Sequence, residues 1–218
     1  MRQVRQSFIS SEKDGIVCGQ KILPIEKVGL YVPGGTAPLF STVLMLAIPA
    51  DIAGCKEIVL CTPPNAEGKV NPTILYAAKI SGVKKIFKIG GIQAIGAMAY
   101  GTESVPKVYK IFGPGNQYVM AAKQQVSLHD VAIDMPAGPS EVAIIADETA
   151  NPASVAADML SQAEHGKDSQ SIVFTTSQAL ADALVTEVEK QVAIAPRKDF
   201  IQCSLEHSKI FILDSMDD

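Results

Sequence analysis

The feature that most constrains the fold is a regular alternation of short apolar runs with helix-forming segments, punctuated by glycine and proline. Residues 57–62 form a continuous apolar run, which is typical of a strand whose two sheet faces are both covered. The expected strands are residues 28–32, 57–62, 85–89, 110–112, 131–133, 141–146, 171–176 and 209–213, and the expected helices are 41–53, 72–81, 92–100, 117–125, 151–165 and 178–192. This alternation predicts an α/β fold with parallel, doubly wound sheets.

Two passages of the chain follow the same plan. A Pro/Gly turn near Pro33, an Ala-rich helix and an apolar strand ending at Thr62 are matched by a turn at 135–140, the helix 151–165 and the strand 171–176. This similarity suggests a duplicated α/β unit, although ordinary recurrence of β-α-β units would give the same pattern.

The remaining segments carry weaker signals. Residues 1–27 are predicted to be a helix or an extended arm that leads inward at residues 22–25. Residues 197–208 are a segment of mixed composition that leads to the last strand. The helix near residue 41 is expected to have Ser41 or Thr42 as its cap.

Composition excludes several classes of function. The net charge is −4, tryptophan is absent and no basic patch occurs, so nucleic acid is not an expected partner. The longest apolar stretch, residues 43–50, is broken by Pro49, and no membrane partner is expected. No secretory signal and no paired cysteine motif occur, so a cytoplasmic protein with reduced, buried thiols is expected.

Three loops that follow predicted strands carry the candidate binding residues: 33–38, 90–93 and 113–116. They should meet at one edge of a parallel sheet, where such sheets bind ligands. Gly113-Pro114-Gly115-Asn116 precedes a helix, and free N–H groups at a helix start favour phosphate. A tight turn with Asn116 as helix cap explains the same residues, and the glycines at 90–91 are equally suited to close packing.

The helix predicted between Asn151 and Gly166 carries a second candidate site. Gln162 and His165 are three residues apart and should leave the same helix face, where an amide oxygen and an imidazole can bind a metal together. A histidine that complements the helix dipole is the simpler explanation. Ser140 begins a strand after a glycine-containing turn, where it could face a ligand or cap the turn.

Five blocks, in this order, resemble the histidinol dehydrogenase family. They are LYVPGGTAPLFSTVLM at 30–45, GGIQAI at 90–95, IFGPGN at 111–116, IDMPAGPSE at 133–141 and LSQAEHG at 160–166. The resemblance runs from about residue 20 to the last residue. It implies the oxidation of L-histidinol to L-histidine through the aldehyde, with zinc and two NAD, in the last steps of histidine biosynthesis.

The resemblance also implies roles for individual residues. Tyr31, Gln93 and Asn116 match NAD-contacting positions. Ser140 matches a substrate-contacting serine. Gln162 and His165 match zinc ligands that also contact the substrate.

The architecture implied by the family is a homodimer of chains with two similar, incomplete Rossmann-like α/β domains, one inserted in the other. Here residues 31–139 would form the inserted NAD-side domain. Residues 1–30 and 140–218 would be parts of the outer, zinc- and substrate-side domain, which would be incomplete.

The chain also departs from the family pattern. Family members are about twice as long. In them the Glu-His pair that supplies the bases follows a Gly-Pro, and no Gly-Pro-Glu-His occurs in this sequence. The Glu-His bases and the remaining zinc ligands are therefore expected to be missing, and the chain alone is expected to be inactive. Glu206-His207 has different surroundings. A non-catalytic ligand-binding or scaffold homologue is the alternative, and a zinc-free NAD oxidoreductase is a third possibility.

Overall fold

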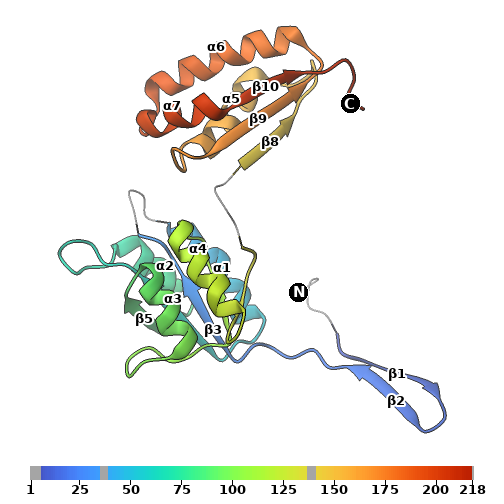
Figure 1. The fold of residues 1–218 in the computed structure, drawn as a ribbon, viewed down its shortest axis with the longest axis vertical. Helices are drawn as coiled ribbons and strands as arrows, with labels where there is room; N and C mark the ends of the chain where they lie inside the picture. The colour runs from blue at the N-terminus through green and yellow to red at the C-terminus, as the bar shows by residue number, and fades with distance from the viewer. Residues whose placement is uncertain (1–5, 35–38, 137–140, 218) are drawn as a thin grey trace. The chain divides into compact units, whose positions relative to one another are not determined.

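The computed structural model describes residues 6–34, 39–136 and 141–217, with the side chains of residues 11 and 12 left aside. Internal contacts divide the chain into two compact units, Met1–Ala137 and Gly138–Asp218 (Figure 1). The predicted division into residues 31–139 and residues 1–30 with 140–218 stays a prediction.

The first unit is built on a five-stranded parallel sheet with strand order β5-β4-β3-β6-β7. Its strands are β3 (Lys27–Tyr31), β4 (Glu57–Thr62), β5 (Lys85–Lys88), β6 (Lys110–Phe112) and β7 (Ala132–Ile133). The chain builds outward from β3 to β5 on one side, then returns to place β6 on the other side of β3. The strand order therefore reverses between β3 and β6, which is where open α/β sheets bind ligands.

Helices cover both faces of this sheet. On one face, α1 (Phe40–Ile52) and α2 (Pro72–Ile80) pack on Val28 and Leu30 of β3. On the other face, α3 (Gly91–Tyr100) and α4 (Gln117–Ser127) pack on Tyr31 of β3 and Ile111 of β6. Alternate residues of β3 thus enter different cores, as period-two strands require. The predicted α/β class with parallel sheets is confirmed.

The helix starts follow the capping rules only in part. Asn71 and Asn116 cap α2 and α4, since each side-chain oxygen accepts a backbone N–H of the first turn. The predicted cap of α1 is wrong, because the helix begins at Phe40 and its N-cap is Leu39, without a side-chain hydrogen bond.

The prediction of a helix or plain extended arm before β3 needs a correction. β1 (Phe8–Lys13) and β2 (Ile16–Gln20) form an antiparallel hairpin. Asp14 and Gly15 connect them, and Gly15 has the positive φ of +81° that tight hairpin turns require. Every residue of β2 is exposed, so burial does not specify the hairpin within this chain.

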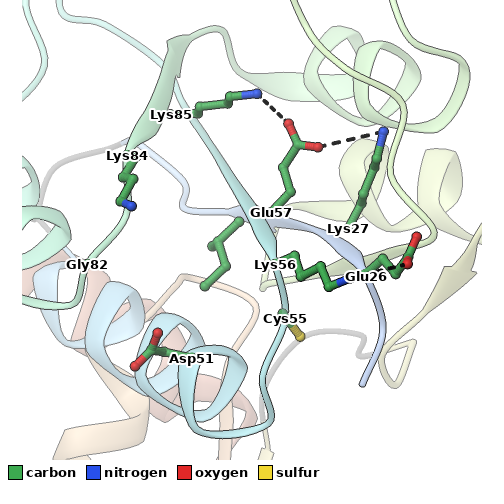
Figure 2. A pocket seen from close by; sticks show the side chains of 10 residues that line it. Glu26, Lys27, Asp51, Cys55, Lys56, Glu57, Gly82, Lys84 and Lys85 are labelled. Carbon is green, nitrogen blue, oxygen red and sulfur yellow. Dashed lines mark hydrogen bonds and ion pairs between the residues drawn. The ribbon is translucent and has the colours of Figure 1, made fainter. Parts of the chain in front are cut away.

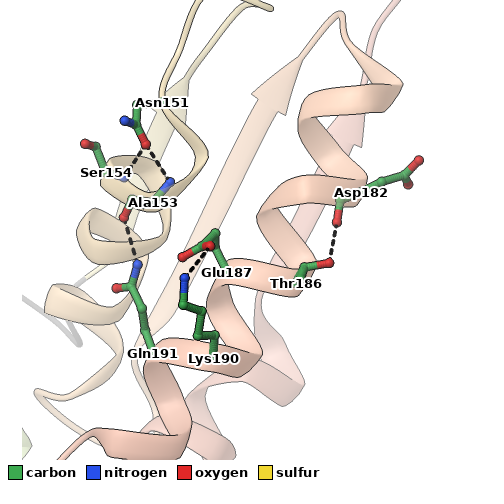
Figure 3. A network of polar contacts seen from close by, with 8 residues as sticks. All are labelled: Asn151, Ala153, Ser154, Asp182, Thr186, Glu187, Lys190 and Gln191. Carbon is green, nitrogen blue, oxygen red and sulfur yellow. Dashed lines mark hydrogen bonds and ion pairs between the residues drawn. The ribbon is translucent and has the colours of Figure 1, made fainter.

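The second unit holds a three-stranded parallel sheet of order β10-β9-β8. Its elements are β8 (Glu141–Ile145), α5 (Pro152–Ala163), β9 (Gln170–Thr175), α6 (Gln178–Ile194), α7 (Lys198–His207) and β10 (Lys209–Ile212). Helices α5 and α6 pack on the face that carries Ile144 and Val173. Figure 3 shows Asn151 capping α5 and the Gln191 amide of α6 donating to the Ala153 carbonyl oxygen of α5 at 2.9 Å.

Residues 197–208, which the sequence shows only as a mixed segment before the last strand, contain a helix. Helix α7 occupies this segment and buries Ile201 against Leu160 and Ala163 of α5. The opposite sheet face carries a row of aligned side chains, Ile145, Phe174 and Phe211. The two phenylalanine rings stack at 5.4 Å, and Ile145 is 74% exposed. The similarity of the two units as a duplicated Rossmann-like pair stays a prediction.

Candidate functional site

The loops that follow β3, β4 and β5 interlock at the carboxyl edge of the first sheet. The ring of Pro63, after β4, lies between Gly34, after β3, and Gly90, after β5. A Cβ atom on Gly34 or Gly90 would lie 2.4 or 2.6 Å from that ring. Close packing therefore explains Gly90, and the same contact fixes the entry to α3. Residues 35–38 of the first loop lie outside the described residues.

Tyr31 connects two of these loops from within the core. Its side chain is 4% exposed, and its hydroxyl accepts a hydrogen bond of 3.0 Å from the Gly91 backbone N–H. Gly91 begins α3 with φ of +64°, and Gln93 follows, exposed, in the first turn. The sequence placed Tyr31 in the strand 28–32 and Gln93 in the loop 90–93, and the structure brings the Tyr31 hydroxyl to the turn before Gln93.

The third loop packs on the backbone of the first. Gly113 has φ of +129°, and a Cβ there would lie 2.0 Å from the Tyr31 carbonyl oxygen, so no other residue fits this approach. Asn116 is exposed, and its side-chain oxygen accepts from the Val119 N–H at 3.0 Å. The predicted helix cap is confirmed, and the remaining polar end of the amide is a donor.

A buried ion pair beneath this loop was not recognised from the sequence. Lys123 of α4 is 1% exposed, and its ammonium group pairs with Asp134, which follows β7. Lys123 also donates to the Gly113 carbonyl oxygen at 2.7 Å, and the Gly113 N–H donates to Asp134 at 2.7 Å. The available signal was a lysine at a position where its helical neighbours Val119 and Val126 are apolar.

The second candidate site lies at the end of α5. The helix ends earlier than predicted, at Ala163 with Glu164 as C-cap, and the His165 N–H donates to the Gln162 carbonyl oxygen at 3.1 Å. His165 is exposed. The Gln162 amide nitrogen is buried and has no hydrogen-bond partner within residues 6–34, 39–136 and 141–217. Ser140 lies outside the described residues.

The amino edge of the first sheet carries a pocket of about 490 Å³ with a different character (Figure 2). Glu57 lies between Lys85 and Lys27 and pairs with both, with 3.6 Å separating its oxygen from the Lys27 ammonium nitrogen. The hydrogen bond from Lys85 lowers the pKa of Glu57. This pocket is at the opposite end from the loops, so it is not the ligand edge expected of a parallel sheet.

Comparison with known proteins decides the family. The family model described as histidinol dehydrogenase matches residues 1–218. The chain belongs to the histidinol dehydrogenase family.

Relatives at high identity support the assignment. A histidinol dehydrogenase from Bacteroides fragilis (strain YCH46) is 68% identical over 205 residues, which are 94% of this chain and 48% of the relative. One from Haemophilus influenzae (strain 86-028NP) is 57% identical over 215 residues, 99% of this chain and 49% of the relative. The chain therefore spans about half the length of these histidinol dehydrogenases.

Solved structures agree. The crystal structure of histidinol dehydrogenase from Elizabethkingia anophelis has a TM-score of 0.94 and 56% identity, covering 99% of this chain and 50% of that one. A putative aldehyde dehydrogenase from Burkholderia cenocepacia shares the fold at 20% identity and a TM-score of 0.56, covering 88% and 38% of the two chains. No helix within the described part of this chain is long and apolar enough to span a membrane.

The residues present fit part of the zinc site that the histidinol dehydrogenase family implies. The buried amide nitrogen of Gln162 has no hydrogen-bond partner among the described residues, and rotation of the amide would bring its oxygen, a possible metal ligand, to the same place. His165 offers an exposed imidazole nearby in the chain. Within the described residues, no group of three His, Cys, Asp or Glu side chains is placed to hold a metal. These two residues could supply at most half of a four-coordinate zinc shell, so a complete site would need ligands from other residues.

Proposed function

We propose that this chain forms the NAD-binding edge and part of the zinc and substrate site of a histidinol dehydrogenase. The reaction is the oxidation of L-histidinol to L-histidine through L-histidinaldehyde, with two NAD. The observation that carries the proposal is the interlocked carboxyl edge at the β3–β6 strand reversal, in a chain matched throughout by the family model.

NAD is assigned to the edge of the first sheet, with Tyr31, Gln93 and Asn116 as its binding residues. Tyr31 fixes the turn before Gln93 through Gly91. Asn116 begins α4, whose N-terminal N–H groups favour the negative charge of a pyrophosphate. The exposed ends of Gln93 and Asn116 supply hydrogen bonds for orientation.

Zinc and the substrate are assigned to the second unit. Gln162 and His165 would ligate zinc, and His165 must be neutral to do so. Zinc polarises the reacting oxygen of a bound alcohol when it is present. Ser140 is assigned a substrate contact, and residues 140–218 with 1–30 are assigned to the zinc-side domain.

The bases of the reaction are assigned to the half of the family protein that this chain does not cover. Glu206 and His207 are exposed in α7, and they are not assigned this role. The chain alone is therefore expected to be inactive. The complete protein is proposed to act as a cytoplasmic homodimer.

The test is histidinol-dependent NADH formation with zinc supplied, first by this chain and then after addition of the remaining half of the B. fragilis relative. We expect no turnover by the chain alone and turnover after addition. Turnover by the chain alone would place the bases within these residues. Failure of a folded complex to turn over would favour the non-catalytic homologue.

A further inference from the structure

Gly113 has both of its backbone polar groups bound by the side chains of one ion pair. The Lys123 ammonium donates to its carbonyl oxygen, and Asp134 accepts its N–H, each at 2.7 Å. We propose that Lys123 and Asp134 are positioning residues that hold the loop 113–116 in its NAD-binding conformation. The inference rests on the proposed function, since it takes NAD to be the ligand of this loop.

Lys123 is not placed to bind a phosphate itself. Its side chain is 1% exposed, and its ammonium group is already bound to Asp134 and to the Gly113 carbonyl oxygen. A charge buried this deeply requires an opposite charge and further hydrogen bonds, and the two partners supply both. The lysine therefore acts on the ligand only through the loop.

The pair connects three elements that must keep their relative positions. Lys123 is on α4, Asp134 follows β7, and Gly113 follows β6. Gly113 in turn packs against the Tyr31 backbone at the end of β3. The first turn of α4 and Asn116 are thus held relative to both strands at the reversal.

Without the pair, the groups of Gly113 would be free to bond with water or with the ligand. A loop whose hydrogen bonds are satisfied before binding loses less conformational freedom on binding, and this raises affinity. Gly113 has no side chain of its own, so its orientation depends on its backbone bonds. The Lys123–Asp134 ion pair therefore fixes the orientation of the Gly113 backbone.

The first arm of the test measures hydrogen exchange of the Gly113 amide in the ligand-free chain by NMR. We expect Lys123→Met and Asp134→Leu to accelerate it by about ten- to hundredfold, the scale for losing a hydrogen bond to a charged group. Asp134→Asn keeps an acceptor oxygen and should give a smaller acceleration. Lys85→Met, which breaks an ion pair at the opposite edge, is the control and should leave this amide unchanged.

The second arm measures NAD affinity by titration calorimetry, at a temperature where circular dichroism shows each variant folded. We expect the dissociation constant to rise by about ten- to hundredfold in Asp134→Leu and less in Asp134→Asn. If Lys123→Met does not fold, Asp134→Leu and Asp134→Asn alone test whether the ion pair positions the loop.

Each other outcome has a definite meaning. If hydrogen exchange of the Gly113 amide is unchanged in Asp134→Leu, the proposal that the ion pair holds this loop is overturned. Faster exchange with unchanged NAD affinity would overturn the positioning role and leave the proposed function standing. Absence of NAD binding by the unaltered chain would overturn the NAD assignment itself, and the inference with it.

Discussion

The hydroxyl of Tyr31 accepts a hydrogen bond of 3.0 Å from the backbone N–H of Gly91, sixty residues further along the chain. A side chain at the end of the central strand thereby fixes the first residue of α3. Because the ring is buried, core packing sets the position of the hydroxyl, and the bond itself is partly buried.

Tyr31→Phe removes this bond and keeps the packed ring. We expect the free energy of unfolding to fall by about 0.5–1.5 kcal/mol, the usual net worth of one hydrogen bond. If the carboxyl edge of the first sheet binds NAD, the affinity of Tyr31→Phe for NAD should fall as well. Urea denaturation and NAD titration provide the measurements. Tyr76→Phe, at a residue 66% exposed, is the control and should change neither quantity.

Asn116→Ala should have two separable effects. Loss of the α4 cap should lower the free energy of unfolding by about 1 kcal/mol. Loss of the amide should weaken NAD binding by about 1–3 kcal/mol. Asn116→Asp keeps the capping oxygen and should lose only NAD affinity. As a control, Asn151→Ala removes the cap of α5 and should lower stability without changing NAD affinity. Unchanged NAD affinity in both Asn116 variants would exclude Asn116 from the site.

Two glycine-to-alanine substitutions should change the free energy of unfolding in opposite directions. Gly113→Ala places a methyl group against the Tyr31 carbonyl oxygen at a positive φ, so we expect a loss of about 2–4 kcal/mol in unfolding free energy. Gly96→Ala adds a methyl group in open space within α3 and should raise stability by about 0.5–1 kcal/mol. Denaturation curves of the two variants check the pair, and equal effects would contradict the geometry at Gly113.

Gln162→Leu should raise the stability of the chain and remove a proposed zinc ligand. The buried amide nitrogen has no partner in the part of the chain that the structure describes, so an apolar replacement should raise the unfolding free energy by about 1 kcal/mol. The same change, or His165→Ala, made in a full-length relative should abolish zinc retention, measured by metal analysis after dialysis. Gln191→Leu breaks a hydrogen bond to α5 and should lower stability instead. Full zinc occupancy in either site variant would contradict the ligand assignment.

Glu57 should give a pH-dependent contribution to stability. Its pKa is lowered in the folded chain by the bond from Lys85, so its contribution is present above the usual carboxyl pKa and is lost as pH falls through the lowered value. Glu57→Gln should therefore destabilise at neutral pH by less than about 1 kcal/mol, as for partly exposed pairs, and have no effect in strong acid. Melting temperatures across this pH range provide the measurement. A difference that grows in acid would contradict this sign.

The sequence pattern predicted the parallel strands well because their apolar runs are buried from both sides. Val59, Leu60 and Cys61 are all fully buried, and burial raises the pKa of the Cys61 thiol to about 12. The elements that the sequence pattern missed have no such buried apolar run. The strand β2 is wholly exposed, and only the Asp14-Gly15 turn marks the hairpin.

Helix α7 was missed because its start carries no recognisable cap. Its N-cap is Arg197, which makes no side-chain cap hydrogen bond, and only Ile201 and Ser204 are buried on it. At the candidate site, the pattern placed the loops at one sheet edge. It could not show that Lys123 and Asp134 meet, because their pairing depends on where α4 and β7 lie in the folded sheet.

The position of β3 at the centre of the sheet also sets the order in which the first unit can assemble. Its neighbour β4 follows soon after it, but its other neighbour, β6, pairs Val28 with the distant Lys110. Contacts between distant residues form late because closing a long loop costs entropy. During synthesis, we therefore expect one side of β3 to stay unpaired until β6 has left the ribosome, and during that time this strand edge is open to incorrect pairing.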